Sequence, residues 1–393
     1  MIPPNRRRTV PVNVGGVVVG GAAPVSVQTM TKTQTEDVRG TLDQITRAAE
    51  AGADIVRVTC DTPEAGVAMK EIVANSPVPI VADIHYDAPL ALRALDAGVA
   101  CLRLNPGNIG DPDKVRDIAR EAKARNVPVR IGVNAGSIPQ RKDLERGRGA
   151  TIEETAQRMV DAAMHHIRIL EDLDFTAIKV SLKASDVPTN LAANRYFASL
   201  GRPYPLHLGL TEAGPVESGS VKSAMGIGIL LSEGIGDTIR VSLVGDPVEE
   251  VRVGRQILAN LEEKGSGPNL IACPTCGRLE IDMFPMVRRV EEALQRVRRP
   301  INVAVMGCVV NGPGEGMHAD IGIAGGRQKG ILYKGGRVIA SLPEAELIDA
   351  LLHELDVIAA EDARLIAEGR PLPVGLGDSG GTPSLTRVPM AQR

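Results

Sequence analysis

Short runs of β-branched residues alternate with helix-period segments along the first two thirds of the chain, from Val25 to about Leu261. Each run is followed by a segment long enough to cross back over a sheet, which is the pattern of parallel strands joined by helices. Eight such runs in roughly 250 residues predict an α/β fold, a (β/α)8 barrel of the TIM type. The alternative is an open, doubly wound sheet, although no Gly-x-Gly-x-x-Gly follows the first run. The eight predicted strands are Val25–Met30, Ile55–Thr59, Ile80–Ile84, Cys101–Asn105, Val129–Asn134, Ala177–Lys183, Leu206–Glu212 and Thr238–Val244.

Aromatic residues make up only 2% of the chain and Trp is absent, so the core must be built from aliphatic side chains. Branched aliphatic residues suit the layered interior of a parallel barrel. The scarcity of aromatics argues against a single-stranded nucleic-acid site, because such sites depend on stacking. The formal net charge of -3 provides no global basic field for DNA or an anionic membrane. The odd number of cysteines, five, and the lack of an apolar leader predict a reducing, cytoplasmic location.

Changes in composition divide the chain into parts. Gly15-Gly16, between the valine-rich segments Val10–Val14 and Val17–Val19, predicts a β-hairpin that closes the lower end of the barrel. A Gly-, Ser- and Pro-containing segment later interrupts the strand–helix alternation. We therefore expect a substrate-binding barrel over residues 1–262, a linker over 263–269, a smaller α+β domain over 270–369 and a disordered tail over 370–393.

Basic residues recur at alternate positions in five of the predicted strands. Side chains of one parity point into a barrel, and those near the carboxyl ends of the strands line its mouth. Arginine binds phosphate oxygens in a bidentate manner, so converging cations predict a polyanion site, such as one for a diphosphate. The alternative is that they form salt bridges with Asp83 and Glu212. The cations concerned are Arg57, Arg103, Arg130, Lys183 and Arg240.

Other polar residues also fall at strand ends. Glu212 closes the seventh predicted strand and is the carboxylate best placed for proton transfer. Asp83 and His85 lie at the end of the third strand and either contact substrate hydroxyls or hold neighbouring arginines. His207 lies earlier in its strand, where we expect a core histidine with satisfied hydrogen bonds.

Three cysteines lie in two Gly- and Pro-rich segments of the second part, Cys273-Pro-Thr-Cys276-Gly and Cys308-Val-Val-Asn-Gly-Pro-Gly-Glu315. A Cys-x-x-Cys pair with a remote third cysteine is typical of iron–sulfur clusters. A structural zinc site remains an alternative, with His318 as its fourth ligand. A thioredoxin-like redox pair is disfavoured because of the third cysteine. Cys60 and Cys101 adjoin or begin apolar strands, where we expect them to be buried as small hydrophobic residues.

These segments resemble the two cluster motifs of the GcpE family of 4-hydroxy-3-methylbut-2-enyl diphosphate synthases. The resemblance spans nearly the whole chain to about Lys334, and as a set its motifs are highly specific. The further motifs are Val25-Ser-Val-Gln-Thr-Met-Thr, Ala82-Asp-Ile-His, Leu104-Asn-Pro-Gly-Asn-Ile-Gly, Lys179-Val-Ser-Leu-Lys-Ala-Ser-Asp and Leu208-Gly-Leu-Thr-Glu-Ala-Gly.

The resemblance implies a [4Fe–4S] cluster held by Cys273, Cys276, Cys308 and the carboxylate of Glu315, which is harder and more easily displaced than a thiolate. It implies that 2-C-methyl-D-erythritol 2,4-cyclodiphosphate is reduced by two electrons to 4-hydroxy-3-methylbut-2-enyl diphosphate, a step of the non-mevalonate isoprenoid pathway. Glu212 matches the family residue thought to manage protons. The residues that match the family's diphosphate site are Arg57, Arg103, Arg130, Asn134, Lys183, Arg240 and Ser242.

The resemblance also implies partners. Electrons would come from flavodoxin or ferredoxin, and the working unit would be a homodimer in which the cluster domain of one subunit covers the barrel mouth of the other. Two alternatives remain at this stage. One is a barrel transferase resembling dihydropteroate synthase, with a structural zinc, and the other is a non-catalytic metal-binding scaffold whose barrel cations form salt bridges.

Overall fold

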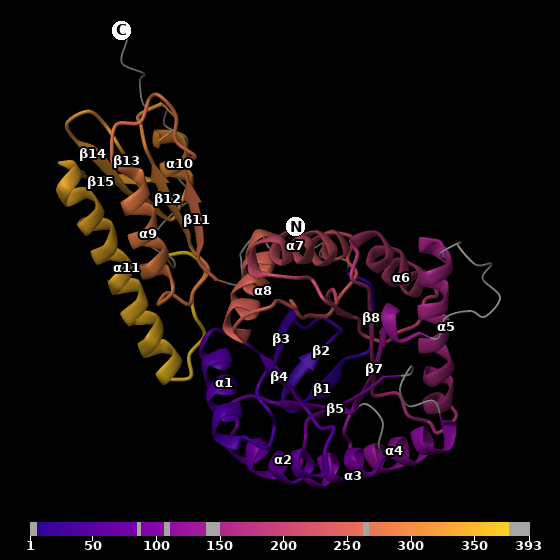
Figure 1. Cartoon of the computed structure of the whole chain (residues 1–393). Coiled ribbons are helices and arrows are strands. Elements are labelled where there is room, and N and C mark those ends of the chain that lie inside the picture. The colour runs from indigo at the N-terminus through magenta and orange to yellow at the C-terminus, as the bar shows by residue number, and fades with distance from the viewer. Residues whose placement is uncertain are drawn as a thin grey trace. The chain divides into compact units, whose positions relative to one another are not determined.

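The computed structural model describes residues 6–84, 88–105, 111–138, 150–261, 267–310 and 312–376 (Figure 1). The chain divides into two compact units, Met1–Leu261 and Glu262–Arg393. His85, most of the predicted linker and the tail from residue 377 lie outside the described residues. Within the described ranges, no helix is both long and apolar enough to cross a membrane.

The first unit is a parallel barrel surrounded by helices (Figure 1). Its strands follow the order β8-β7-β6-β5-β4-β3-β10-β9, and a parallel bridge between Val180 and Leu206 joins the two ends of this order. This arrangement confirms the predicted (β/α)8 barrel and excludes the doubly wound sheet. The strands are β3 (Ser26–Met30), β4 (Ile55–Thr59), β5 (Ile80–Ile84), β6 (Cys101–Leu104), β7 (Val129–Asn134), β8 (Ile178–Lys183), β9 (His207–Leu208) and β10 (Thr238–Ile239).

Several of the barrel helices begin at polar residues that satisfy their first backbone N–H groups. Thr62 and Asp111 each precede a proline at the first helical position, and Thr151 forms a capping box with Glu154. The helices are α1 (Val38–Glu50), α2 (Pro63–Asn75), α3 (Ala88–Asp96), α4 (Pro112–Ala124), α5 (Ile152–Glu171), α6 (Val187–Ser199), α7 (Val216–Ser232) and α8 (Pro247–Leu261), with one 3-10 turn, η1 (Ala135–Ser137).

The last two barrel strands are shorter than predicted. β9 ends at Leu208 because the next residue, Gly209, has φ +155°, and a Cβ there would stand 2.3 Å from the carbonyl oxygen of Arg240. The prediction that Glu212 closes this strand is therefore wrong. Glu212 lies in the following turn, in the left-handed region with φ 53°.

The predicted hairpin is confirmed: β1 (Val12–Val14) pairs with β2 (Val17–Val19) across Gly15 and Gly16, which both have positive φ. Its buried side chains pack against the first inward residues of three strands, so the hairpin closes the amino-terminal end of the barrel. Cys101 belongs to this cluster, and Cys60 is also fully buried, as expected of small hydrophobic residues. The cluster consists of Val12, Val14, Val19, Ile55, Val81 and Cys101.

The second unit is a five-stranded sheet with helices on both faces. β11 (Asn269–Ala272), β12 (Asn302–Met306) and β13 (Ile321–Ala324) are parallel, and β14 (Gly330–Lys334) and β15 (Arg337–Leu342) extend the sheet in antiparallel fashion. Helices α9 (Met283–Leu294) and α11 (Glu344–Ala367) pack on one face around Val303, Val305, Ile321 and Ile323. The short helix α10 (Gly312–His318), which the sequence did not predict, packs on the other face beside Ala324 and Tyr333.

Candidate functional site

The barrel strands alternate between two environments. On β6, Leu102 and Leu104 belong to the core beneath the helices, whereas Arg103 between them points the other way, into the barrel. The register places Asp83 beside Arg103 and Arg103 beside Arg130. The predicted inward cations Arg103 and Arg130 are therefore neighbours on adjacent strands.

Asp83 orients two of these arginines. Its Oδ1 lies 3.0 Å from Nη1 of Arg103, and its Oδ2 lies 3.5 Å from Nε of Arg57. Arg103 also donates from Nη2 to the carbonyl oxygen of Gly132, where a Cβ would stand 2.6 Å from Arg103 Nε. Only glycine leaves room for this guanidinium. Burial lowers the pKa of Arg57 to about 10, and the attraction of Asp83 opposes that shift.

Arg130 differs from Arg57 and Arg103 because it forms no ion pair with any of the described residues. Its side chain is 1% exposed, and none of its three guanidinium nitrogens has a hydrogen-bond partner within the described residues. Burial, and then the charges of Arg57 and Arg103, lower its pKa well below the usual range. Burial, and then Arg240 and Arg130, likewise lower the pKa of Lys183. Buried cations without partners are costly, and a bound polyanion would neutralise them.

A second carboxylate at the mouth is Glu250, which the sequence analysis missed. Glu250 is 1% exposed in the first turn of α8, and its carboxylate pairs with Arg240 at 3.3 Å and with Lys32 at 3.1 Å. The alternative interpretation, in which the cations form salt bridges with Asp83 and Glu212, is thus confirmed for Asp83 and wrong for Glu212. Among the described residues Glu212 makes no ion pair, and Glu250 takes that place. Acidic residues are common in the first turn of a helix, where they interact favourably with the helix dipole. The position of Glu250 in the sequence therefore did not indicate a role at the barrel mouth.

The neutral predicted residues also lie at the mouth. Asn134 ends β7, and its backbone carbonyl accepts a hydrogen bond from Ser137. Ser242 follows β10, and its buried Oγ has no hydrogen-bond partner in the described part of the chain. Glu212 is exposed, with its left-handed backbone in the turn after β9.

Two further residues of the barrel, His207 and Lys179, are fully buried, and Lys179 is the strand partner of Arg130. His207 is a core residue as predicted, but the expectation that its hydrogen bonds are satisfied is wrong. Both ring nitrogens lack a partner among the described residues. Burial, and then the charge of Arg130, lower the pKa of His207 well below its usual value, so the ring is neutral.

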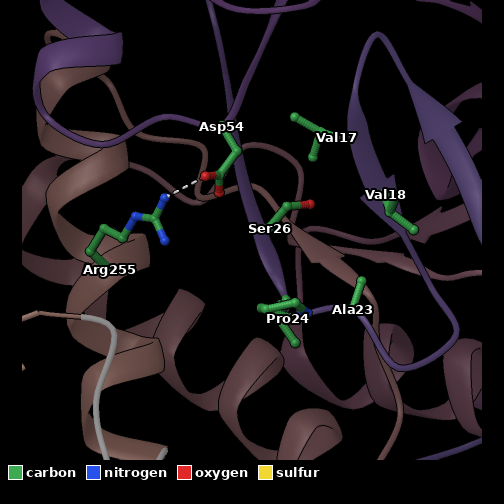
Figure 2. A pocket seen from close by; sticks show the side chains of 8 residues that line it. Val17, Val18, Ala23, Pro24, Ser26, Asp54 and Arg255 are labelled. Carbon is green, nitrogen blue, oxygen red and sulfur yellow. Dashed lines mark ion pairs between the residues drawn. The ribbon is translucent and has the colours of Figure 1, made fainter. Parts of the chain in front are cut away.

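Two cavities, of about 250 and 300 Å³, lie at the opposite end of the barrel from these cations. Figure 2 shows the first, where Asp54 precedes β4 and its carboxylate lies 2.8 Å from Arg255 Nη2. The second is lined by residues that precede β5 and β6, including Pro79 and Ala100. Barrel enzymes place their chemistry at the carboxyl ends of the strands, so neither cavity belongs to the candidate site.

In the second unit, backbone hydrogen bonds bring the cysteine-bearing segments to one edge of the sheet. Cys273 follows β11 and donates its N–H to Val305 of β12 at 3.0 Å. The N–H of Glu280, four residues after Cys276, bonds to the carbonyl oxygen of Gly307, beside Cys308. Helix α10 then begins with a bond from the N–H of Gly312 to the carbonyl oxygen of Cys308. We call these segments, residues 273–280, 307–310 and 312–318, the cysteine edge.

Glycines bring α10 close to the sheet. A Cβ at Gly312 would stand 2.6 Å from Cβ of Ala324, and one at Gly316 would stand 2.7 Å from the ring of Tyr333. This close contact explains the glycines at positions 312 and 316. Glu315 lies about one helical turn after Gly312, the first residue of α10.

The donor set of the cysteine edge suits a soft-metal centre in residue type and in backbone placement. The cysteines are free thiols, with Cys308 buried, Cys273 half-buried and Cys276 exposed. Glu315 and His318 are exposed on α10. In the described ranges, however, no three His, Cys, Asp or Glu side chains gather into a group that could hold a metal ion. The match to an iron–sulfur cluster is thus one of residue type and backbone placement, and not of side-chain geometry.

Comparison with known proteins covers both units. The model described as the GcpE TIM-barrel domain matches residues 9–255, and that of the GcpE protein C-terminal domain matches residues 269–357. The chain is 51% identical to a protein of Magnetococcus marinus over 91% of this chain and 94% of that one. It is 53% identical to one of Dehalococcoides mccartyi over 89% of this chain and 98% of that one. Both relatives are named 4-hydroxy-3-methylbut-2-en-1-yl diphosphate synthase (flavodoxin).

Among solved structures, a dihydropteroate synthase from Coxiella burnetii is similar to part of the chain. The match has a TM-score of 0.47 and 13% identity, and it covers 63% of this chain and 96% of that one. Such a weak likeness carries no argument about activity. Both family models and the near full-length relatives lead to one conclusion: the chain belongs to the GcpE family.

Proposed function

We propose that the chain is a 4-hydroxy-3-methylbut-2-en-1-yl diphosphate synthase, an iron–sulfur oxidoreductase of the non-mevalonate isoprenoid pathway. Its substrate is 2-C-methyl-D-erythritol 2,4-cyclodiphosphate. The ring opens as the substrate takes up two electrons and a proton, and one oxygen leaves as water. Relatives of about half-identical sequence bear this enzyme name over nearly their whole length. The observation that carries the proposal is Arg130, a buried guanidinium that has no hydrogen-bond or ion-pair partner within the described residues and lies beside other barrel cations.

The barrel mouth binds the cyclic diphosphate in this proposal. Asp83 fixes Arg57 and Arg103, and Glu250 fixes Arg240, so their guanidinium groups are oriented before the substrate arrives. Preorganised cations stabilise developing charge without reorganising during the reaction. Asn134 and Ser242 supply neutral hydrogen-bonding groups, and the substrate supplies a counterion to Arg130 and Lys183, which form no ion pair within the described part of the chain. The residues assigned to diphosphate binding are Arg57, Arg103, Arg130, Asn134, Lys183, Arg240 and Ser242.

Glu212 handles the proton. It is exposed at the mouth, where a substrate can reach its carboxylate, and its left-handed backbone is the kind of strain that is concentrated at functional positions. The departing hydroxyl needs a proton to leave as water, and within the described residues no ion pair holds the Glu212 carboxylate away from a substrate at this mouth.

The cysteine edge would hold a [4Fe–4S] cluster through Cys273, Cys276, Cys308 and the carboxylate of Glu315. When bound, the cluster supplies electrons one at a time and a position that a harder ligand can vacate. Glu315 is exposed near the start of α10, so its side chain is free to move without unpacking the helix. The names of the relatives include flavodoxin. In this proposal, flavodoxin or ferredoxin delivers the electrons. The working unit is a cytoplasmic homodimer.

The first experiment is to purify the chain without oxygen and measure iron, zinc, acid-labile sulfide and oligomeric state. We expect about four irons and four sulfides per chain, as in a [4Fe–4S] protein, and turnover of the cyclodiphosphate with a low-potential reductant. Stoichiometric zinc without sulfide would overturn the redox proposal. It would favour a transferase that uses the same anion site.

A further inference from the structure

Glu250 forms hydrogen bonds with residues of two neighbouring segments, strand β3 and the loop that follows strand β10. Its carboxylate accepts a hydrogen bond from Thr29 of β3 at 2.8 Å and from the backbone N–H of Leu243, after β10, at 3.0 Å. The same group pairs with Arg240 at 3.3 Å. A buried carboxylate with this many donors is a rigid anchor, because each contact restricts the others.

Lys32 completes this anchor from the loop after β3. Its Nζ lies 3.1 Å from Glu250, donates to the carbonyl oxygen of Leu243 at 2.7 Å and also bonds to that of Gly245. The side chain of Lys32 is 30% exposed, whereas that of Glu250 is 1% exposed. The loop after β10, which carries Ser242, is therefore held at Leu243 and Gly245.

This loop is in turn joined to the segment that follows Glu212. The N–H of Val244 bonds to the carbonyl oxygen of Gly214 at 2.9 Å, and Val244 forms a parallel bridge with Pro215. Three positions of the proposed site, Arg240, Ser242 and Glu212, are thus connected to the Glu250–Lys32 ion pair. Arg240 is attached directly, Ser242 through its loop, and Glu212 through the Val244–Gly214 contact.

We infer that Glu250 and Lys32 are a positioning pair for the diphosphate site, since they set the direction of the Arg240 guanidinium and the course of the Ser242 loop. The inference rests on the proposed function, because it concerns the same anion site. Neither residue is assigned a contact with the substrate. Correct placement of one charge-assisted hydrogen bond contributes a free energy that corresponds to about a tenfold change in affinity.

The test replaces Glu250 by Gln in the full-length, cluster-loaded protein and measures the Kd of inorganic diphosphate by calorimetry. Gln keeps the shape but loses the charge and part of the accepting capacity of the carboxylate. We expect the Kd to rise about tenfold, the KM for the cyclodiphosphate to rise with it, and kcat to stay within about twofold. The matched control is Glu233→Gln, which removes the same charge from an exposed pair with Arg195. This control should leave the Kd unchanged.

Lys32→Met should weaken diphosphate binding in the same way, and Lys32→Arg should restore it. A double-mutant cycle between Glu250→Gln and Arg240→Ala separates positioning from a general loss of stability. Positioning requires the two effects to be non-additive, because Glu250 acts through Arg240. Wild-type affinity in Glu250→Gln, or strict additivity in the cycle, would overturn the inference. If the wild-type protein does not bind diphosphate at all, the proposed anion site itself is wrong.

Discussion

Asp83 and Arg103 face each other across neighbouring barrel strands, with Asp83 Oδ1 3.0 Å from Arg103 Nη1, and both side chains are almost fully buried. The same carboxylate lies 3.5 Å from Arg57. One carboxylate, that of Asp83, therefore pairs with two arginines. Because the cations in this part of the barrel outnumber the anions, the interior carries excess positive charge, which a bound polyanion can offset.

Replacing Asp83 by Asn should destabilise the free protein, because two buried guanidinium groups lose their counterion. Loss of one partner of a buried ion pair costs about 3–5 kcal/mol in unfolding free energy. Chemical denaturation of the variant measures this loss. Asp117→Asn is the control, since Asp117 pairs with Arg120 on the exposed face of α4, and it should change stability by less than about 1 kcal/mol. Equal effects of the two substitutions would show that Asp83 is not a buried counterion.

Replacing Arg130 by Met should separate stability from binding. Its guanidinium is buried and without a partner among the described residues, so an apolar side chain of similar length should maintain or raise the unfolding free energy. The affinity for the cyclodiphosphate should fall by at least tenfold, because one charge-assisted contact corresponds to about that factor. Iron content should not change. A variant that loses substrate affinity and cluster content in equal measure would instead indicate a structural role.

The sequence predicted those site residues that a local pattern marks, and it did not predict those that depend on contacts between distant segments. Arg103 and Arg130 were predicted correctly as inward residues because the period of a strand is two and their neighbours are apolar. Glu250 was missed because its role comes from partners on other segments, Thr29, Lys32 and Arg240, that only the closed barrel brings together. No local pattern records such contacts.

The fold shows the same division between local and non-local causes. Strands β4 and β5 agree with the prediction to the residue, since β-branched runs bounded by polar residues define them. β9 was predicted too long, because Gly209 approaches the backbone of Arg240 across the barrel. Helix α10 was not predicted, because glycines are poor helix formers and two of its glycines, Gly312 and Gly316, are explained only by their contacts with Ala324 and Tyr333.

His207 should make the protein sensitive to acid. Burial and the neighbouring cations hold its pKa well below the ordinary value of 6.5, so the folded protein keeps the ring neutral, whereas the unfolded chain protonates it below pH 6.5. The unfolded state then binds more protons, and the unfolding free energy falls as the pH drops below 6.5. His207→Gln should flatten this dependence. Denaturation curves between pH 7 and pH 5 test it, and identical slopes for variant and wild type would contradict the assignment.

Glu315→Ala should retain the fold and lose most of the turnover. The side chain is exposed on α10 and makes no hydrogen bond or ion pair within the described residues, so its removal should change the unfolding free energy by no more than about 0.5 kcal/mol. The proposed cluster, however, would lose its one carboxylate ligand, and three thiolates would remain to hold it. Anaerobic turnover with a chemical reductant, measured beside iron and sulfide content, separates the two effects. Glu346→Ala, at another acidic position in the first turn of a second-unit helix, is the control and should keep wild-type turnover. A near-wild-type rate in Glu315→Ala would mean that the site needs no displaceable carboxylate.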